Sequence, residues 1–295
     1  MNLYKQQVYA IYENEETTTI QYVITNKCNL NCSYCPKKFL YDQSNFDNID
    51  KFIEDTKTFY NNNKENTKGI EIYITGGEPL TDFKAIEYLL KKLARLDFIK
   101  NIIIFSNGIL LTPTIIKKLN ILKAVVDFKF YLTIHPSSTG LSKVKYLNTI
   151  TKFAKFFISK MIILNKDYFE EFINNLDTYS DYEVQPNMID TDELLKLKEL
   201  SFERNKSFVY NNIPLDIIDL YISTRFNFKG WTCSAGKSYF IYNREKLYTC
   251  ATDYHKKKEI QDEFGKGVPL NEYIIKPTIC ENTKCACEQS LHKRL

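Results

Sequence analysis

Short apolar runs alternate with longer amphipathic runs over the first 200 residues. The apolar runs, rich in β-branched residues, predict strands at 18–25, 69–75, 102–105, 125–134, 156–164 and 182–188. Apolar positions spaced three to four residues apart predict helices at 46–61, 81–95, 112–122, 141–153, 166–178 and 190–203. Thr81 and Asp190 are expected to cap two of these helices. Six strand–helix units in succession indicate parallel strands joined by right-handed crossovers.

Six units are fewer than the eight of a closed barrel, so the predicted fold is α/β, a partial (β/α)6 parallel barrel over residues 1–204. Residues 205–230 are predicted to be a linker. The alternation then stops, and the run SYFIYNREKLYTC predicts a hairpin of 239–242 and 246–249. Residues 231–295 are predicted to form a small cysteine-rich segment, which has so little apolar periodicity that it needs a metal or cluster.

Composition narrows the possible partners. Forty Lys and Arg against 36 Asp and Glu leave a net charge of +4, so no nucleic-acid partner is expected. No apolar run is long enough to span a bilayer, and the N-terminus lacks a secretory signal. A cytoplasmic location, with no membrane partner, is therefore expected. Disulfides are uncommon there, so the eight cysteines are better explained as metal or cluster ligands.

Unusual residues follow the predicted strands at the ends where parallel α/β proteins gather functional groups. Three cysteines with the spacing C-x3-C-x2-C follow the first strand, at Cys28, Cys32 and Cys35. Three thiolates suit a cubane cluster, which normally takes four ligands, so one iron is left open for another ligand. The Gly76-Gly77-Glu78 turn after the second strand permits close backbone approach and adds an acceptor for an amine. A ligand with an amine and a carboxylate fits this pattern.

The run 28–35, followed by Gly76-Gly77-Glu78-Pro79, resembles the radical S-adenosylmethionine (SAM) superfamily over residues 18–190. The resemblance implies that Cys28, Cys32 and Cys35 bind a [4Fe–4S] cluster whose open iron chelates SAM. It further implies a set of SAM-binding residues. The Gly76-Gly77-Glu78-Pro79 turn is expected at the amino group and Tyr34 near the adenine. Ser106 and Asn107, at the end of the third strand, are expected near SAM, and Thr133 and His135, at the end of the fourth, near the ribose.

The C-terminal cysteines resemble the SPASM and twitch extensions of the same superfamily. The match begins with Cys233-Ser234-Ala235-Gly236 and continues at Cys250. It implies a second [4Fe–4S] cluster, held by Cys233 and Cys250 with two of Cys280, Cys285 and Cys287. Glu245 stands where those extensions have a glycine, so the hairpin turn is expected to differ, because glutamate tolerates positive φ poorly.

The resemblance implies an enzyme that reductively cleaves SAM to a 5′-deoxyadenosyl radical, fed by a low-potential electron donor such as flavodoxin or ferredoxin. The expected substrate is a ribosomally made peptide or protein that undergoes modification. Oxidation of a small molecule, such as an aminocyclitol or sugar alcohol, is the alternative. A non-catalytic iron–sulfur redox protein is a third reading, which the glycine-rich turn argues against. No catalytic residue is singled out.

Simpler explanations stay open for several of these residues. A structural zinc ion could occupy either cysteine group, with His135 as the only nearby histidine for the first. His135 could also be a strand-end histidine satisfied by backbone, and Tyr34 could serve packing alone. Gln185, near the end of the sixth strand, is read as structural.

Overall fold

The computed structural model describes most of the barrel and parts of the C-terminal third. The described residues are 17–32, 35, 46–179, 182–186, 192–193, 195–197, 199, 209–210, 213–214, 232–233, 237–243, 245–249, 267–276, 278–279 and 293–294.

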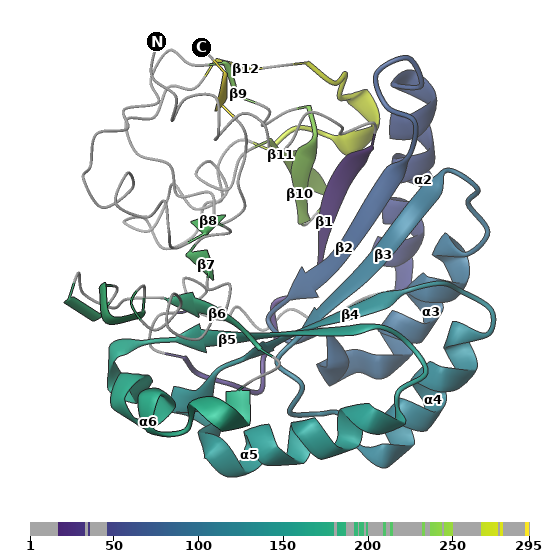
Figure 1. Cartoon of the computed structure of the whole chain (residues 1–295). Coiled ribbons are helices and arrows are strands. Elements are labelled where there is room, and N and C mark those ends of the chain that lie inside the picture. Colours follow the sequence, from purple (N-terminus) through teal and green to yellow (C-terminus); the bar gives the residue numbers. More distant parts are fainter. Residues whose placement is uncertain are drawn as a thin grey trace.

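An eight-stranded sheet in the order β11–β10–β1–β2–β3–β4–β5–β6 forms the centre of the molecule (Figure 1). Its strands are β1 (Thr18–Thr25), β2 (Ile70–Gly76), β3 (Ile99–Ser106), β4 (Lys129–Ile134), β5 (Ile158–Leu164), β6 (Glu183–Pro186), β10 (Tyr239–Asn243) and β11 (Lys246–Tyr248). Strands β1 to β6 pair in parallel and in chain order, as predicted. Their carboxyl ends therefore meet along one rim of the sheet.

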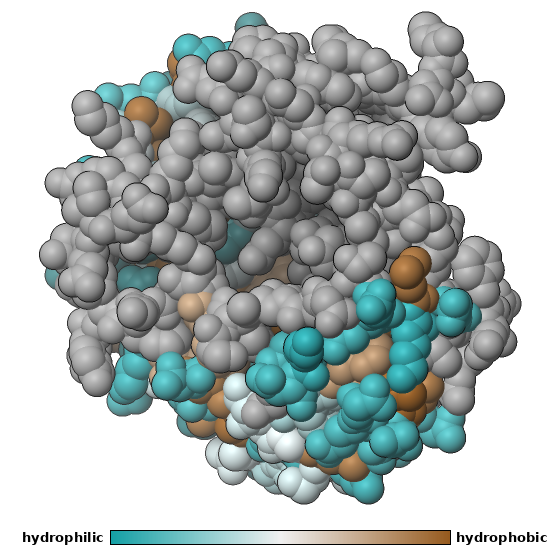
Figure 2. All heavy atoms as spheres, turned by 90° about the vertical axis from the view of Figure 1, so that its left-hand side faces the viewer, coloured by the Kyte–Doolittle hydropathy of each residue, from teal (hydrophilic) through white to brown (hydrophobic). Residues whose placement is uncertain are grey.

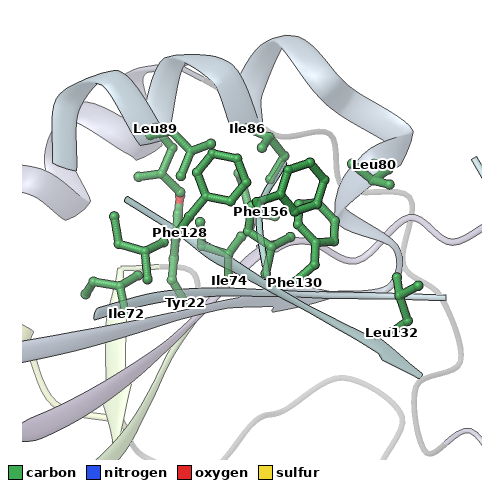
Figure 3. Close-up of a cluster of buried hydrophobic side chains, with 14 of the residues drawn as sticks. Tyr22, Ile72, Ile74, Leu80, Ile86, Leu89, Phe128, Phe130, Leu132 and Phe156 are labelled. Atoms are coloured by element: carbon green, nitrogen blue, oxygen red, sulfur yellow. The ribbon is translucent and has the colours of Figure 1, made fainter. Parts of the chain in front are cut away.

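Helices cover the outer face of this curved sheet (Figure 1). They are α2 (Phe46–Asn62), α3 (Phe83–Leu93), α4 (Pro113–Lys123), α5 (Pro136–Ile150) and α6 (Phe169–Asn174). Alternate strand residues point toward them, and Figure 3 shows Ile72 and Ile74 of β2 below Ile86 and Leu89 of α3. These four side chains are completely buried, as expected for a parallel sheet whose face is covered by helices.

Side-chain caps fix where two of the helices begin. The predicted cap of the helix after the second strand, Thr81, is wrong, because Asp82 accepts the hydrogen bond from the Ala85 amide at the start of α3. Thr81 lies instead in a 3-10 turn, Pro79–Asp82, which Glu78 caps. Thr112 caps α4 through the Ile115 amide, just before Pro113 at the first helical position.

Other boundaries also differ from the sequence prediction. Strand β4 begins at Lys129 instead of 125, because the amides of Val125 and Val126 bond back to the Leu122 carbonyl at the end of α4. The predicted helix 166–178 divides into the short helix α6 between two 3-10 turns. Of the predicted helix 190–203, the described residues between 192 and 199 are helical.

The predicted hairpin exists, and it continues the barrel sheet. Strand β10 pairs in parallel with β1, and β11 pairs antiparallel with β10. Tyr242 of β10 contacts the rings of Tyr22 and Phe52, which stack on each other at 4.0 Å, and its hydroxyl donates to Asp55 at 3.2 Å. The division into 1–204, 205–230 and 231–295 stays a prediction, although the hairpin shares the sheet and the outer core of the first segment.

Glu245 in the hairpin turn has a φ of 62°, in the left-handed region that favours glycine. From the resemblance to the SPASM and twitch extensions, we expected this turn to differ, because glutamate stands in place of their glycine. Glu245 nevertheless adopts a conformation typical of glycine. The closing pair is Asn243 with Lys246, which leaves a two-residue loop. The turn therefore carries a cost in backbone strain at Glu245.

Hydrophilic side chains cover much of the described surface in the view of Figure 2, with hydrophobic ones between them. Among the residues that the structure describes, no helix has the length and apolar character required to cross a membrane.

Candidate SAM and cluster site

The three cysteines of the first motif lie on the loop that leaves β1. Cys28, Cys32 and Cys35 are half-buried free thiols, and the Cys35 amide donates to the Cys32 carbonyl at 3.0 Å. Within the described ranges, no three Cys, His, Asp or Glu side chains are close enough together to hold a metal ion. The structure thus brings the three thiols to one loop without closing them around a common point.

Glu78 connects the ends of β2 and β3 through a buried carboxylate. Its side chain is only 1% exposed. One oxygen, Oε1, accepts from the Leu80 amide at 2.9 Å and from Ser106 Oγ at 2.8 Å, and Oε2 accepts from the Asn107 amide at 2.7 Å. Burial raises the pKa of this carboxyl to about 7, although the three hydrogen bonds lower it. The carboxylate is thus a brace between two strand ends.

Asn107 extends this brace to the cysteine loop. Its side-chain amide donates to Asn29 Oδ1 at 2.8 Å and lies 3.9 Å from Cys28 Sγ. The Leu30 amide also donates to Cys28 Sγ, at 3.4 Å. A continuous set of hydrogen bonds therefore links Glu78 at the end of β2, through Asn107 after β3, to the loop after β1.

Gly76 and Gly77 bring the glycine-rich turn against the β1 loop. Gly76 has a φ of 152°, and a Cβ there would collide with the Thr25 carbonyl oxygen. A Cβ on Gly77 would collide with the Lys27 carbonyl oxygen. The amides of Gly77 and Glu78 donate to Thr25 and Lys27 at 2.8 Å. Only glycine permits this approach, which places backbone groups of the turn beside the start of the cysteine loop.

The end of β4 completes the rim. Thr133 lies near the end of this strand, and His135 directly follows it. Burial lowers the pKa of His135 to about 4, so the imidazole is neutral at pH 7. The His135 carbonyl accepts from the amides of Ser138 and Thr139, at 2.9 and 3.1 Å, and Ser138 Oγ lies 3.3 Å from Cys32 Sγ.

This donor set fits an iron–sulfur cluster. Three thiols on one loop supply sulfur ligands, and hydrogen-bond donors already point at two of the sulfurs, from Leu30 and Asn107 to Cys28 and from Ser138 to Cys32. Burial raises the pKa of the Cys28 thiol, with smaller contributions from nearby Glu78, Cys32 and Cys35. A positively charged metal centre would offset this cost and hold the thiolate form.

Hydrogen bonds thus connect Cys28, Glu78, Ser106 and Asn107, and a separate one joins Ser138 to Cys32. Pro79, Thr133 and His135 lie on the same rim. Tyr34, Cys250, Cys280, Cys285 and Cys287 lie outside the described residues. Asn29 and Ser138 were not predicted as site residues. Asn29 stands inside the cysteine motif and could have been considered, whereas nothing in the sequence around Ser138 indicates that it meets Cys32.

A family model described as the radical SAM superfamily matches residues 22–191, more than half of the chain. The chain belongs to the radical SAM superfamily. The match spans the barrel from β1 to just beyond β6 and includes both the cysteine motif and the glycine-rich turn. Membership supports a [4Fe–4S] cluster and SAM as cofactors of this radical SAM protein.

Individual proteins are similar to this chain in sequence or in structure. The chain is 30% identical over 246 residues to the radical SAM cyclopropyl synthase TigE of Paramaledivibacter caminithermalis, covering 74% of this chain and 49% of TigE. It thus spans about half the length of this curated relative. Native anSMEcpe with bound AdoMet has a similar structure, with a TM-score of 0.60, 15% identity and coverage of 87% of this chain and 78% of that one. Native anSMEcpe with bound AdoMet and Kp18Cys peptide gives a TM-score of 0.59 at 15% identity, with the same coverage. At this identity the two structures confirm the fold alone.

Proposed function

We propose that this radical SAM protein binds a [4Fe–4S] cluster through Cys28, Cys32 and Cys35 and binds SAM along the carboxyl ends of β1 to β4. The observation that carries the proposal is the hydrogen-bonded connection from Glu78 through Asn107 to Cys28. It fixes the glycine-rich turn relative to the cysteine loop, so that cluster and SAM share one preorganised rim. When bound, the cluster supplies an electron that splits SAM into methionine and a 5′-deoxyadenosyl radical, which abstracts hydrogen from a substrate.

The protein's own groups position the reactants. Oε1 of Glu78 accepts two protein donors and Oε2 accepts one, so the carboxylate holds the Gly76-Gly77-Glu78 turn in place, and groups of this turn bind the SAM amino group. The neutral His135, at the end of β4, offers the ribose a hydrogen-bonding group without adding positive charge beside the sulfonium. Half-buried aromatic rings of Tyr73, Phe105 and Tyr131 line the inner face of the sheet and limit access of water to the radical.

The proposed substrate is a ribosomally made peptide or protein, and the modification removes hydrogen from a carbon of one residue. TigE, named a cyclopropyl synthase, supports chemistry at an alkyl carbon. A low-potential flavodoxin or ferredoxin is the proposed electron donor. The substrate class and the electron donor rest on the superfamily resemblance, and the curated relative supports the alkyl chemistry alone.

A second [4Fe–4S] cluster in the C-terminal segment is part of the proposal. Strand β9 (Thr232–Cys233) pairs with both β12 (Thr278–Ile279) and β13 (Lys293–Arg294). In this register Cys233 stands opposite Thr278, which precedes Cys280 by two residues in the sequence. The proposed ligands are Cys233 and Cys250 with two of Cys280, Cys285 and Cys287.

The test is 5′-deoxyadenosine formation with SAM and dithionite by anaerobically reconstituted wild type, Cys32→Ala and Cys250→Ala. We expect wild type to form deoxyadenosine, Cys32→Ala to form none, and Cys250→Ala to retain cleavage but lose product with a peptide substrate. A Thr58→Ala change on the exposed face of α2 is the matched control, because its hydroxyl only bonds the Glu54 carbonyl. Deoxyadenosine from Cys32→Ala would refute the first cluster assignment, and full peptide product from Cys250→Ala would refute the second.

A further inference from the structure

A single helical turn carries Ser138 to the cysteine loop. The turn starts after β4, where the His135 carbonyl accepts from the amides of Ser138 and Thr139, and it ends at Gly140. Gly140 has a φ of 72°, a ψ of 164° and no atom within 4 Å of where a Cβ would stand. Backbone conformation, not space, therefore requires glycine there. The break separates this turn from the rest of α5.

Ser138, in the turn before this break, contacts the cysteine loop. Its exposed side chain donates from Oγ to Cys32 Sγ at 3.3 Å, across 106 residues of sequence. The neighbouring hydroxyl, Thr139 Oγ1, instead donates to the His135 carbonyl at 3.1 Å, within the same turn. Of these two adjacent hydroxyls, only that of Ser138 reaches a thiol.

We propose that Ser138 is a positioning residue that donates a hydrogen bond to the Cys32 thiolate and thereby raises the reduction potential of the cluster that Cys28, Cys32 and Cys35 hold. The inference rests on the proposed function, since it requires that cluster. Reduction adds one electron and increases the negative charge on the ligand sulfurs. A hydrogen bond to a sulfur stabilises that extra charge, so the reduced state is favoured. Gly140 supports this contact by letting the turn face the cysteine loop.

The experiment is a potentiometric titration of the reconstituted cluster with dithionite and redox mediators, followed by its electron paramagnetic resonance signal. Wild type, Ser138→Ala, Ser138→Thr, Thr139→Ala and Gly140→Ala are compared, after iron and sulfide have been measured in each. We expect a more negative midpoint potential for Ser138→Ala and for Gly140→Ala. Ser138→Thr retains the hydroxyl, and Thr139→Ala removes one that bonds the His135 carbonyl, so both should match wild type.

The outcomes separate this inference from the proposed function. A wild-type protein without iron and sulfide would overturn both. If wild type is loaded and Ser138→Ala, also loaded, has the wild-type midpoint, the role of Ser138 is refuted while the proposed function stands. If Ser138→Ala does not bind a cluster, Gly140→Ala decides, and an unchanged midpoint in that variant refutes the inference. A shift in Thr139→Ala equal to that in Ser138→Ala would also refute it, because a change in the turn itself would then explain both.

Discussion

Replacing Glu78 by glutamine tests the brace between β2 and β3. The carboxylate is buried, and burial raises its pKa from the ordinary value of 4.5 to about 7. Because the folded pKa lies above the unfolded one, the folded protein binds more protons between these two values. The stability contribution of Glu78 is therefore greatest at low pH and falls as the pH rises through this window.

The magnitude follows from the two pKa values. A shift of about 2.5 pKa units corresponds to about 3.4 kcal/mol in full. Integration between pH 5 and pH 8 gives about 2.5 kcal/mol of that loss. Glutamine does not titrate, but it presents an NH2 group where Glu78 has an acceptor. One backbone amide, of Leu80 or Asn107, is then left without an acceptor, at a cost of about 1–3 kcal/mol that does not change with pH.

The assay is urea unfolding of the reduced apoprotein, wild type and Glu78→Gln, at pH 5 and pH 8. We expect the free energy of unfolding of wild type, relative to the variant, to decrease by about 2.5 kcal/mol from pH 5 to pH 8. Taking the difference between the two proteins cancels the titration of groups that they share. A difference that stays constant, or one that increases with pH, would refute the assignment of Glu78 as a carboxyl whose burial dominates its hydrogen bonds.

Three further predictions concern other parts of the chain. Glu245→Gly should raise the free energy of unfolding by about 1 kcal/mol by relieving the positive φ, whereas Glu245→Ala should not; equal effects in a urea titration would contradict the strain. His135 has a folded pKa of about 4, below its unfolded value, so wild type should lose stability relative to His135→Gln as the pH falls from 6.5 to 4; an imidazole NMR titration centred near 6.5 would contradict this. Asn63→Ala should cost about 3 kcal/mol and expose residues 267–276 to proteolysis, because the buried Asn63 side chain bonds the backbone of Phe59, Tyr273 and Ile275; wild-type protease resistance would contradict it.

Much of the barrel could be predicted because its strands are short, apolar and separated by periodic helices. The errors occurred where local hydrogen bonds override hydrophobicity. Val125 and Val126 have strand propensity, but their amides complete the end of α4. Thr81 does not cap α3 because it lies inside the 3-10 turn Pro79–Asp82, which Glu78 caps. The helix therefore begins later, at Phe83, and Asp82 caps it.

In the candidate site, too, local motifs could be predicted from the sequence, whereas contacts between distant residues could not. Cys28, Cys32 and Cys35 form one short motif and the glycine-rich turn another, so the sequence indicated both as candidate site residues. The function of Glu78 as a buried brace depends on donors 28 and 29 residues away, which no local pattern reveals. The contact of Ser138 with Cys32 spans 106 residues and depends on one glycine. The pairing of β10 with β1 is similarly remote, because the hairpin sequence does not specify which sheet edge it joins.

Iron, sulfide and 5′-deoxyadenosine measured on one anaerobically reconstituted preparation test the central claim most directly. Wild type and the triple variant Cys28→Ala, Cys32→Ala, Cys35→Ala would be compared with SAM and dithionite. The account predicts about eight irons per wild-type chain and about four in the triple variant, with deoxyadenosine formed only by wild type. Zinc in place of iron, or wild-type protein that forms no deoxyadenosine, would contradict it.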